Sequence, residues 1–229
     1  MRDDQRGAAR HRELVDRLTQ DLRPVRRAGS PWLLLVVWLL VVFATIGVAA
    51  LVGLRDDLSS QLARPRYVIT LAALLAGAGL AGYVALLASV PGRISLVEAR
   101  VVGAGVLVLA LITALLGEWT PAPTTAAFIL YGLRCTVCVA AFALLPWLVL
   151  FRAASRAAPL DGRTVGLCMG AAAVLVGTAC VRVACPIDDT IHLAVWHGLP
   201  ALVWTSVSAA AGGVWLMRWL AADQRSITD

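Results

Sequence analysis

Six long apolar stretches constrain the fold of this chain more than any other feature. They cover approximately residues 32–54, 67–90, 101–117, 130–151, 164–182 and 196–217. Each is close to the roughly 20 residues that a helix needs to cross the hydrocarbon core of a bilayer. Because lipid offers no hydrogen bonds to an open backbone, such segments must be helical. The sequence therefore predicts an all-α, polytopic membrane protein with six transmembrane helices.

The composition agrees with this class. Of the 229 residues, 60% are hydrophobic and only 15% are charged, and the mean hydropathy is +0.81. A soluble domain of this length does not need so much apolar sequence. The first stretch is too long for the apolar region of a signal peptide, so we expect it to remain as a span.

The distribution of arginine predicts the orientation. All 20 basic residues are arginines, and placing the N-terminus inside leaves 15 of them in the inner segments. The outer connections then hold Arg55, Arg64, Arg66 and Arg182. Short cytoplasmic loops carry such an excess. We therefore expect both termini in the cytoplasm (N-in/C-in) and a multi-pass protein of the bacterial inner membrane. The positive charge needs no direct nucleic-acid partner.

Residues 1–30 form a polar N-terminal segment, separate from the membrane domain of residues 31–229. Within it an apolar stripe follows a four-residue spacing, made by Leu14, Val15, Leu18 and Leu22. This spacing predicts a short amphipathic helix, which Pro24 should end. Two interpretations are open: the helix lies on the membrane surface, or it docks into a groove of a cytoplasmic protein.

The densest polar cluster lies before the sixth stretch, on the expected outer face. It reads Cys185-Pro186-Ile187-Asp188-Asp189-Thr190-Ile191-His192 and is followed by Trp196 and His197. Cys, Asp and His are ligands for divalent ions such as zinc, so one interpretation is a metal site at the outer face. The other is an interfacial loop in which Asp188 or Asp189 caps a helix. In a regular helix His197, five residues after His192, falls away from the face that Asp188 and His192 share.

The fourth stretch carries a second polar group, Arg134 and Cys135, in its outer third. Cys135 should lie at the depth of Cys185, so the two could form a disulfide or share a metal, or Cys135 is simply a small apolar residue. Arg134 is a costly residue within a span. It should either pair with Asp188 or Asp189 or extend to the outer headgroups.

No catalytic motif is evident, and we expect a protein that is not an enzyme. Two rival functions nevertheless start from these residues. One is a membrane thiol-disulfide oxidoreductase that uses the pairs Cys135/Cys138 and Cys180/Cys185. The other is a metal carrier that uses His192 and His197, although the spans lack the polar path that a carrier needs.

Three segments together resemble one known family. They are Leu14-Val15-Asp16-Arg17-Leu18 through Asp21-Leu22-Arg23-Pro24-Val25-Arg26-Arg27, then Gly132-Leu133-Arg134-Cys135, and the loop with Cys185-Pro186, Asp188-Asp189, His192 and Trp196-His197-Gly198. These segments and the six-span layout resemble the NrsF family, negative regulators of an extracytoplasmic-function (ECF) sigma factor.

The resemblance implies a membrane-bound anti-sigma factor. Its N-terminal segment would hold the sigma factor at the bilayer. The family's paired cysteines, which match Cys135 and Cys185, would sense metal or oxidative stress. Cys138 and Cys180 fall outside the family pattern. We therefore expect the stripe of Leu14, Leu18 and Leu22 to dock on an ECF sigma factor until the outward-facing cysteines respond.

Overall fold

The computed structural model describes residues 13, 15, 29–118 and 125–218, and the regular elements of this part are all helices. Their bounds are α2 (Pro31–Val52), α3 (Leu58–Leu62), α4 (Pro65–Ala88), α5 (Leu96–Leu115), α6 (Thr125–Ala154), α7 (Gly162–Ala184), α8 (Thr190–Leu193), the π-helix η1 (Ala194–Gly198), α9 (Leu199–Ala211) and the π-helix η2 (Gly212–Leu216). Since α8 to η2 run on without a break, the described residues hold six helices long and apolar enough to span a membrane. The prediction of six spanning helices is confirmed.

Each of the six spanning helices in the described part of the chain begins before its predicted apolar stretch, and at α5 and the sixth span a polar cap marks the earlier start. α5 starts at Leu96, where Ser95 and Glu98 bond to each other's backbone in a capping box. The sixth span starts at Thr190, where the Asp189 carboxylate accepts from the backbone N–H of His192. Side chains of this kind satisfy the free N–H groups of a first turn.

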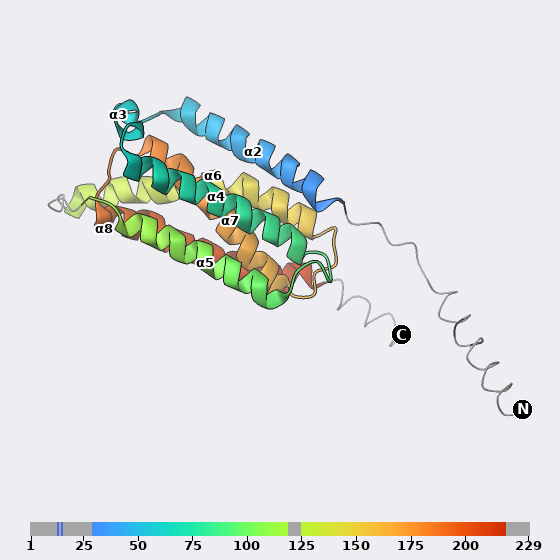
Figure 1. Cartoon of the computed structure of the whole chain (residues 1–229). Coiled ribbons are helices and arrows are strands. Elements are labelled where there is room, and N and C mark those ends of the chain that lie inside the picture. The colour runs from blue at the N-terminus through green and yellow to red at the C-terminus, as the bar shows by residue number, and fades with distance from the viewer. Residues whose placement is uncertain (1–12, 14, 16–28, 119–124, 219–229) are drawn as a thin grey trace, which may run out of the picture.

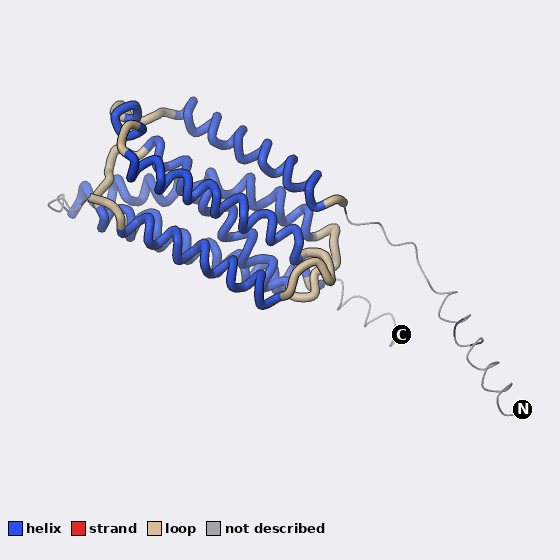
Figure 2. Tube along the Cα trace, viewed as in Figure 1, coloured by secondary structure: helices blue, strands red, loops and turns tan. Residues whose placement is uncertain are grey.

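The bundle is built around α7, which lies among the other spans (Figures 1 and 2). Its small residues allow close approach on several sides. At Gly177 a side chain would collide with the backbone carbonyl of Val139 in α6. At Gly166 it would collide with the carbonyl of Ser208 in α9, whose hydroxyl donates to the Gly166 carbonyl at 2.6 Å. The backbones of α6 and α9 thus contact α7 directly.

α2 lies along one edge of the bundle (Figure 1). Its buried residues, Trp38, Val42, Thr45 and Ala49, form a single stripe at helical spacing. The Trp38 indole donates to the Pro146 carbonyl of α6 at 3.0 Å. Large apolar side chains cover much of the remaining surface, which suits a lipid environment.

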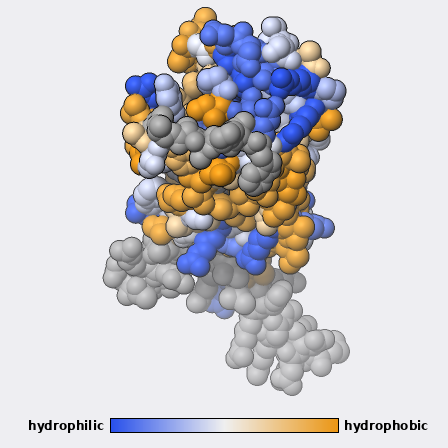
Figure 3. Space-filling view, turned by 90° about the vertical axis from the view of Figure 1, so that its left-hand side faces the viewer, coloured by the Kyte–Doolittle hydropathy of each residue, from blue (hydrophilic) through white to orange (hydrophobic). Residues whose placement is uncertain are grey.

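The two ends of the bundle differ in what they carry. One end, which we call the α8 end, holds α3, α8 and the loops around them, and α2 begins at the opposite end, where η2 also finishes (Figure 1). Viewed from the α8 end, hydrophilic residues gather in the upper part and hydrophobic residues extend across the middle (Figure 3). The topology therefore separates the start of α2 from the Cys185 loop by the full length of the bundle.

Candidate metal centre

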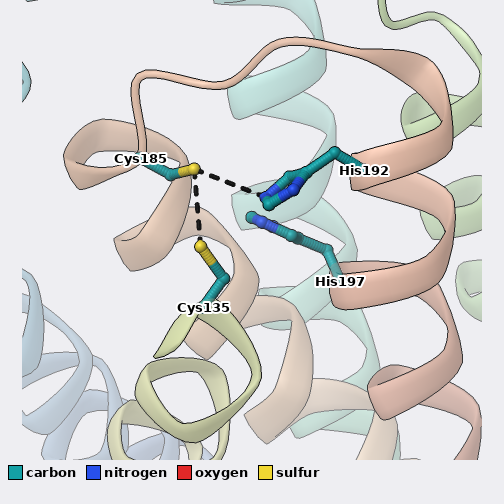
Figure 4. A group of neighbouring side chains, drawn as sticks. All are labelled: Cys135, Cys185, His192 and His197. Atoms are coloured by element: carbon teal, nitrogen blue, oxygen red, sulfur yellow. Dashed lines mark hydrogen bonds between the residues drawn. The ribbon is translucent and has the colours of Figure 1, made fainter. Parts of the chain in front are cut away.

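Four side chains converge at the α8 end: Cys135 from α6, Cys185 at the end of α7, His192 from α8 and His197 from η1 (Figure 4). One ligand atom of each residue lies within 4.8 Å of all the others. Cys185, His192 and His197 are buried, and Cys135 is half-buried. We call this group the tetrad. The sequence predicted each member individually, and the structure brings all four together.

The spacing within the tetrad suits a tetrahedral ion. The Cys135 and Cys185 sulfurs are 3.5 Å apart, and the Cys185 sulfur is 3.7 Å from the His192 Nε2. Zinc bonds of about 2.3 Å to sulfur and about 2.05 Å to nitrogen give tetrahedral edges of about 3.8 Å and about 3.6 Å. These two distances agree with such a site to within a few tenths of an ångström, and all four ligand atoms lie within 4.8 Å of one another.

The π-helix η1 explains how His197 reaches the tetrad. Its wider turn is closed by a bond from the Leu199 N–H to the Ala194 carbonyl, five residues earlier. This geometry places residues five apart on one face, whereas an α-helix does not. The expectation that His197 would fall away from the His192 face is wrong, because it assumed a regular α-helix.

His197 also has an unsatisfied buried ring. Only 2% of the residue is exposed, and neither ring nitrogen has a hydrogen-bond partner within the described part of the chain. Buried polar atoms are rarely left without partners, so such an atom calls for a ligand, an ion or water. This observation points to the tetrad as a binding site independently of its spacing.

The two aspartates serve other purposes. Asp188 accepts from Arg55 at 2.6 and 3.1 Å and from Arg182 at 2.6 Å, and Asp189 caps α8. The expected pairing of Asp188 or Asp189 with Arg134 is wrong. The Arg134 side chain is exposed, and the described residues give it no ion pair. Its exposed position on α6 agrees with the alternative, extension to the headgroups.

Sequence reasoning missed the importance of Arg55, which it counted only as an outer charge. Arg55 is 4% exposed and bonds Asp57 at 2.6 Å as well as Asp188. Burial alone would lower the pKa of Arg55, but these carboxylates outweigh it and raise that pKa. The pKa of Asp57 is lowered in turn by its hydrogen bonds from Arg55 and Gln61. The partner Asp188 lies 133 residues away, and no local pattern signals so distant a contact.

The remaining cysteines lie apart from the tetrad. Cys138 is exposed, and Cys168 and Cys180 are buried in the helical core. The structure thus places Cys135 beside Cys185 rather than forming the pairs that a thiol oxidoreductase was expected to use. At Cys185 the hydrogen bond from the Cys135 thiol, aided by His192, outweighs burial and lowers the pKa.

The proposed docking stripe falls mainly beyond the described part of the chain. Leu14, Leu18 and Leu22 lie outside the described residues. Val15 is helical and 43% exposed. The role of the stripe in docking a sigma factor remains a prediction.

Comparison with known proteins gives one finding. A family model described as "NrsF: Negative regulator of sigma F" matches residues 18–219. No match was found among curated proteins or among solved structures.

Proposed function

We propose, from the premise that this chain belongs to the NrsF family of negative regulators of sigma F, that it acts as a membrane-bound anti-sigma factor. It holds an ECF sigma factor at the bacterial inner membrane and releases it when the tetrad binds a metal ion. The family makes the chain a negative regulator of a sigma factor. The six apolar helices support a multi-pass membrane location. The orientation, with both termini in the cytoplasm, rests on the arginine distribution.

One observation carries the sensing proposal: two thiols and two imidazoles converge at one point, and neither nitrogen of the His197 ring has a hydrogen-bond partner among the described residues. Thiolate and imidazole together suit zinc and softer thiol-binding ions such as cadmium or monovalent copper. Two thiolates would neutralise a divalent ion, which favours that charge in a buried site. The Cys2His2 set would supply all four ligands, as in closed sites that have no open position for catalysis.

The available free energy is sufficient for a switch. Moving a two-state equilibrium from 1:99 to 99:1 requires about 5.5 kcal/mol of difference in binding free energy. Structural Cys/His zinc sites bind with about 10–16 kcal/mol at neutral pH. A tetrad that closes fully in only one state of the bundle can therefore shift the protein between holding and releasing its sigma factor.

Sensing is tested with a sigma-dependent reporter in cells that carry Cys135→Ser or Cys185→Ser. Both variants should still repress the reporter but should no longer respond to added zinc or cadmium, because each loses a ligand. Cys138→Ser is the matched control, since Cys138 is on the same helix and exposed outside the tetrad. Normal induction in both tetrad variants would refute sensing through this site.

Sigma-factor docking is tested separately in the full-length protein. Leu18→Asp places a charge in the predicted stripe of Leu14, Leu18 and Leu22, and should raise the reporter without any metal. Gln20→Asp adds the same charge in the same segment but outside the stripe, and should leave repression unchanged. Equal repression by both variants would refute docking through the stripe.

A second outcome is a redox response, in which Cys135 and Cys185 form a disulfide instead. The sulfur pair at 3.5 Å is close enough to make this chemistry accessible. Induction by a thiol oxidant but not by metal, with purified protein that binds no metal, would favour it.

A further inference from the structure

The loop that carries Cys185 is attached through Arg55 to the segment that directly follows α2. The Arg55 guanidinium donates to both carboxylate oxygens of Asp188, at 2.6 and 3.1 Å, and to the Pro186 carbonyl at 3.4 Å. Its backbone N–H donates to the Val183 carbonyl at 3.1 Å. Residues on both sides of Cys185 are therefore tied to one position that follows α2.

These contacts are geometrically restrictive. A guanidinium that bonds both oxygens of a carboxylate fixes orientation as well as distance. The Arg55 side chain is nearly inaccessible, and the Tyr67 ring lies beneath it, with the guanidinium carbon 5.8 Å from the ring centroid. A displacement of Asp188 must therefore move Arg55 or break a buried, charge-assisted contact.

α2 is suited to carry such a displacement across the bilayer. It has 22 residues, so it is about 33 Å long. Its buried residues form a single stripe in which Thr45 and Ala49 are small. Helices at subunit interfaces shift by about 1–2 Å in known switches, and a movement of that size along the stripe would be sufficient here. At its other end it begins at Pro31, directly after the polar N-terminal segment.

α5 offers a second attachment for the loop but leads elsewhere. The Glu118 N–H donates to the Asp188 carbonyl at 2.7 Å, and the Thr190 N–H donates to the Glu118 carbonyl at 2.8 Å. At Gly117 a side chain would meet the backbone of Thr190 and Asp188, so this approach is close. α5 starts at the loop after α4, not at the N-terminal segment, so this contact holds the loop without reaching the sigma-binding part.

We propose that Arg55 is the positioning residue that transmits the state of the tetrad through α2 to the N-terminal segment. This inference rests on the proposed function. A bound ion holds Cys185 and His192 at the spacing seen here. When the tetrad opens without the ion, the loop between them shifts Asp188, and Arg55 shifts with it. α2 then slides along its stripe and changes how the N-terminal segment presents its docking surface.

The test uses full-length protein in lipid nanodiscs, together with the sigma factor that co-purifies with it. Arg55→Gln removes the charge and keeps most of the side-chain length. Co²⁺ is the probe for the tetrad, because thiolate ligands give it a strong absorbance, and Zn²⁺ is the trigger for release. We expect Arg55→Gln to bind Co²⁺ within twofold of the parent affinity and to retain the sigma factor, while Zn²⁺-triggered release falls at least tenfold.

Two further variants keep the test decisive. Arg64→Gln is the matched control, because Arg64 pairs with Glu118 at the same end at 2.9 Å but both side chains are more than half exposed. It should release the sigma factor like the parent. Arg55→Lys keeps the charge without the two-pronged contact, and release should fall about threefold. If Arg55→Gln does not fold, Arg55→Lys decides.

Four results are distinguishable. Normal Zn²⁺-triggered release by Arg55→Gln overturns the inference and leaves the proposed function intact. Release without Zn²⁺ also overturns it, because Arg55 then locks the resting state instead of transmitting a signal. Loss of Co²⁺ binding overturns it as well, since Arg55 would then only build the site. A parent protein that never releases its sigma factor with Zn²⁺ overturns both the proposed function and this inference.

Discussion

Oxidising the metal-free protein should join Cys135 to Cys185 and to no other cysteine. The two sulfurs are 3.5 Å apart, and a disulfide bond is about 2.05 Å long, so a relative movement of about 1.5 Å brings them into bonding distance. The bond would close a loop across 50 positions of the sequence. The chain-entropy relation assigns about 4 kcal/mol to a fully flexible loop of that length. Because a membrane protein unfolded in detergent keeps much of its helix, we expect an increase of about 2–4 kcal/mol in the free energy of unfolding.

The assay compares unfolding by dodecyl sulfate, with and without a reductant, after treatment with diamide. Maleimide labelling counts the free thiols, and peptide mapping identifies the pair. Cys138→Ser should behave like the parent, whereas Cys135→Ser should show no reductant-dependent change. Prior loading with Zn²⁺ should protect both thiols. A disulfide that involves Cys138, or an oxidised protein that is less stable than the reduced one, would refute the geometry on which the tetrad rests.

Three further predictions follow from packing, charge and the tetrad. Gly177→Ala should lower the free energy of unfolding by about 1–3 kcal/mol, because the added methyl group meets the α6 backbone. Gly79→Ala, where the added methyl group has open space, should be neutral or stabilising. Equal effects of the two substitutions would contradict the close packing of α7 against α6. At Asp161, burial raises the pKa, but hydrogen bonds from Thr164 and Arg100 outweigh it and lower that pKa. The contribution of Asp161 to the free energy of unfolding is therefore present above the unfolded-state pKa and is lost as the pH falls through the folded-state value. Asp161→Asn should flatten the acid side of a stability–pH profile, and an unchanged profile would exclude this contribution. His197→Ala should weaken Co²⁺ binding at least tenfold in a spectroscopic titration, and unchanged affinity would remove His197 from the site.

The sequence predicted the spans well because hydrophobic length is a local property. A run of about 20 apolar residues has few alternatives in a bilayer, so the six helices follow without knowledge of their packing. The start of α5 was placed five residues late because the apolar stretch was read alone. The Ser95–Glu98 capping box, which is visible in the sequence, marks the start of that helix.

The candidate site was less predictable because it depends on contacts between distant segments. Cys135 and Cys185 could be matched by depth, since each lies near the same end of its span. The partners of Asp188 could not, because Arg55 and Arg134 both had the required charge. Only the packing of α2 against the bundle places Arg55 beside the loop and leaves Arg134 exposed.

The π-turn supplies a last prediction about how the site is built. Successive residues of an α-helix turn by about 100°, so residues five apart differ by about 140° and residues four apart by about 40°. We interpret η1 as a single extra residue inserted into an α-helix. Deleting Ala194 should then convert η1 to α-helix, and His192 and His197 would stay on one face because they would be four positions apart. We expect this deletion to keep Co²⁺ binding within about tenfold of the parent.

Deletion of Val137 is the matched control for this prediction. It removes one residue from the regular helix α6 and turns Cys135 by about 100° relative to the residues that follow. Because no extra turn absorbs that change, the Cys135 sulfur leaves the tetrad and Co²⁺ binding should be lost. If the Ala194 deletion abolishes binding as completely as the Val137 deletion does, the wider turn is itself required to position His197, and a one-residue insertion is not the correct description of η1.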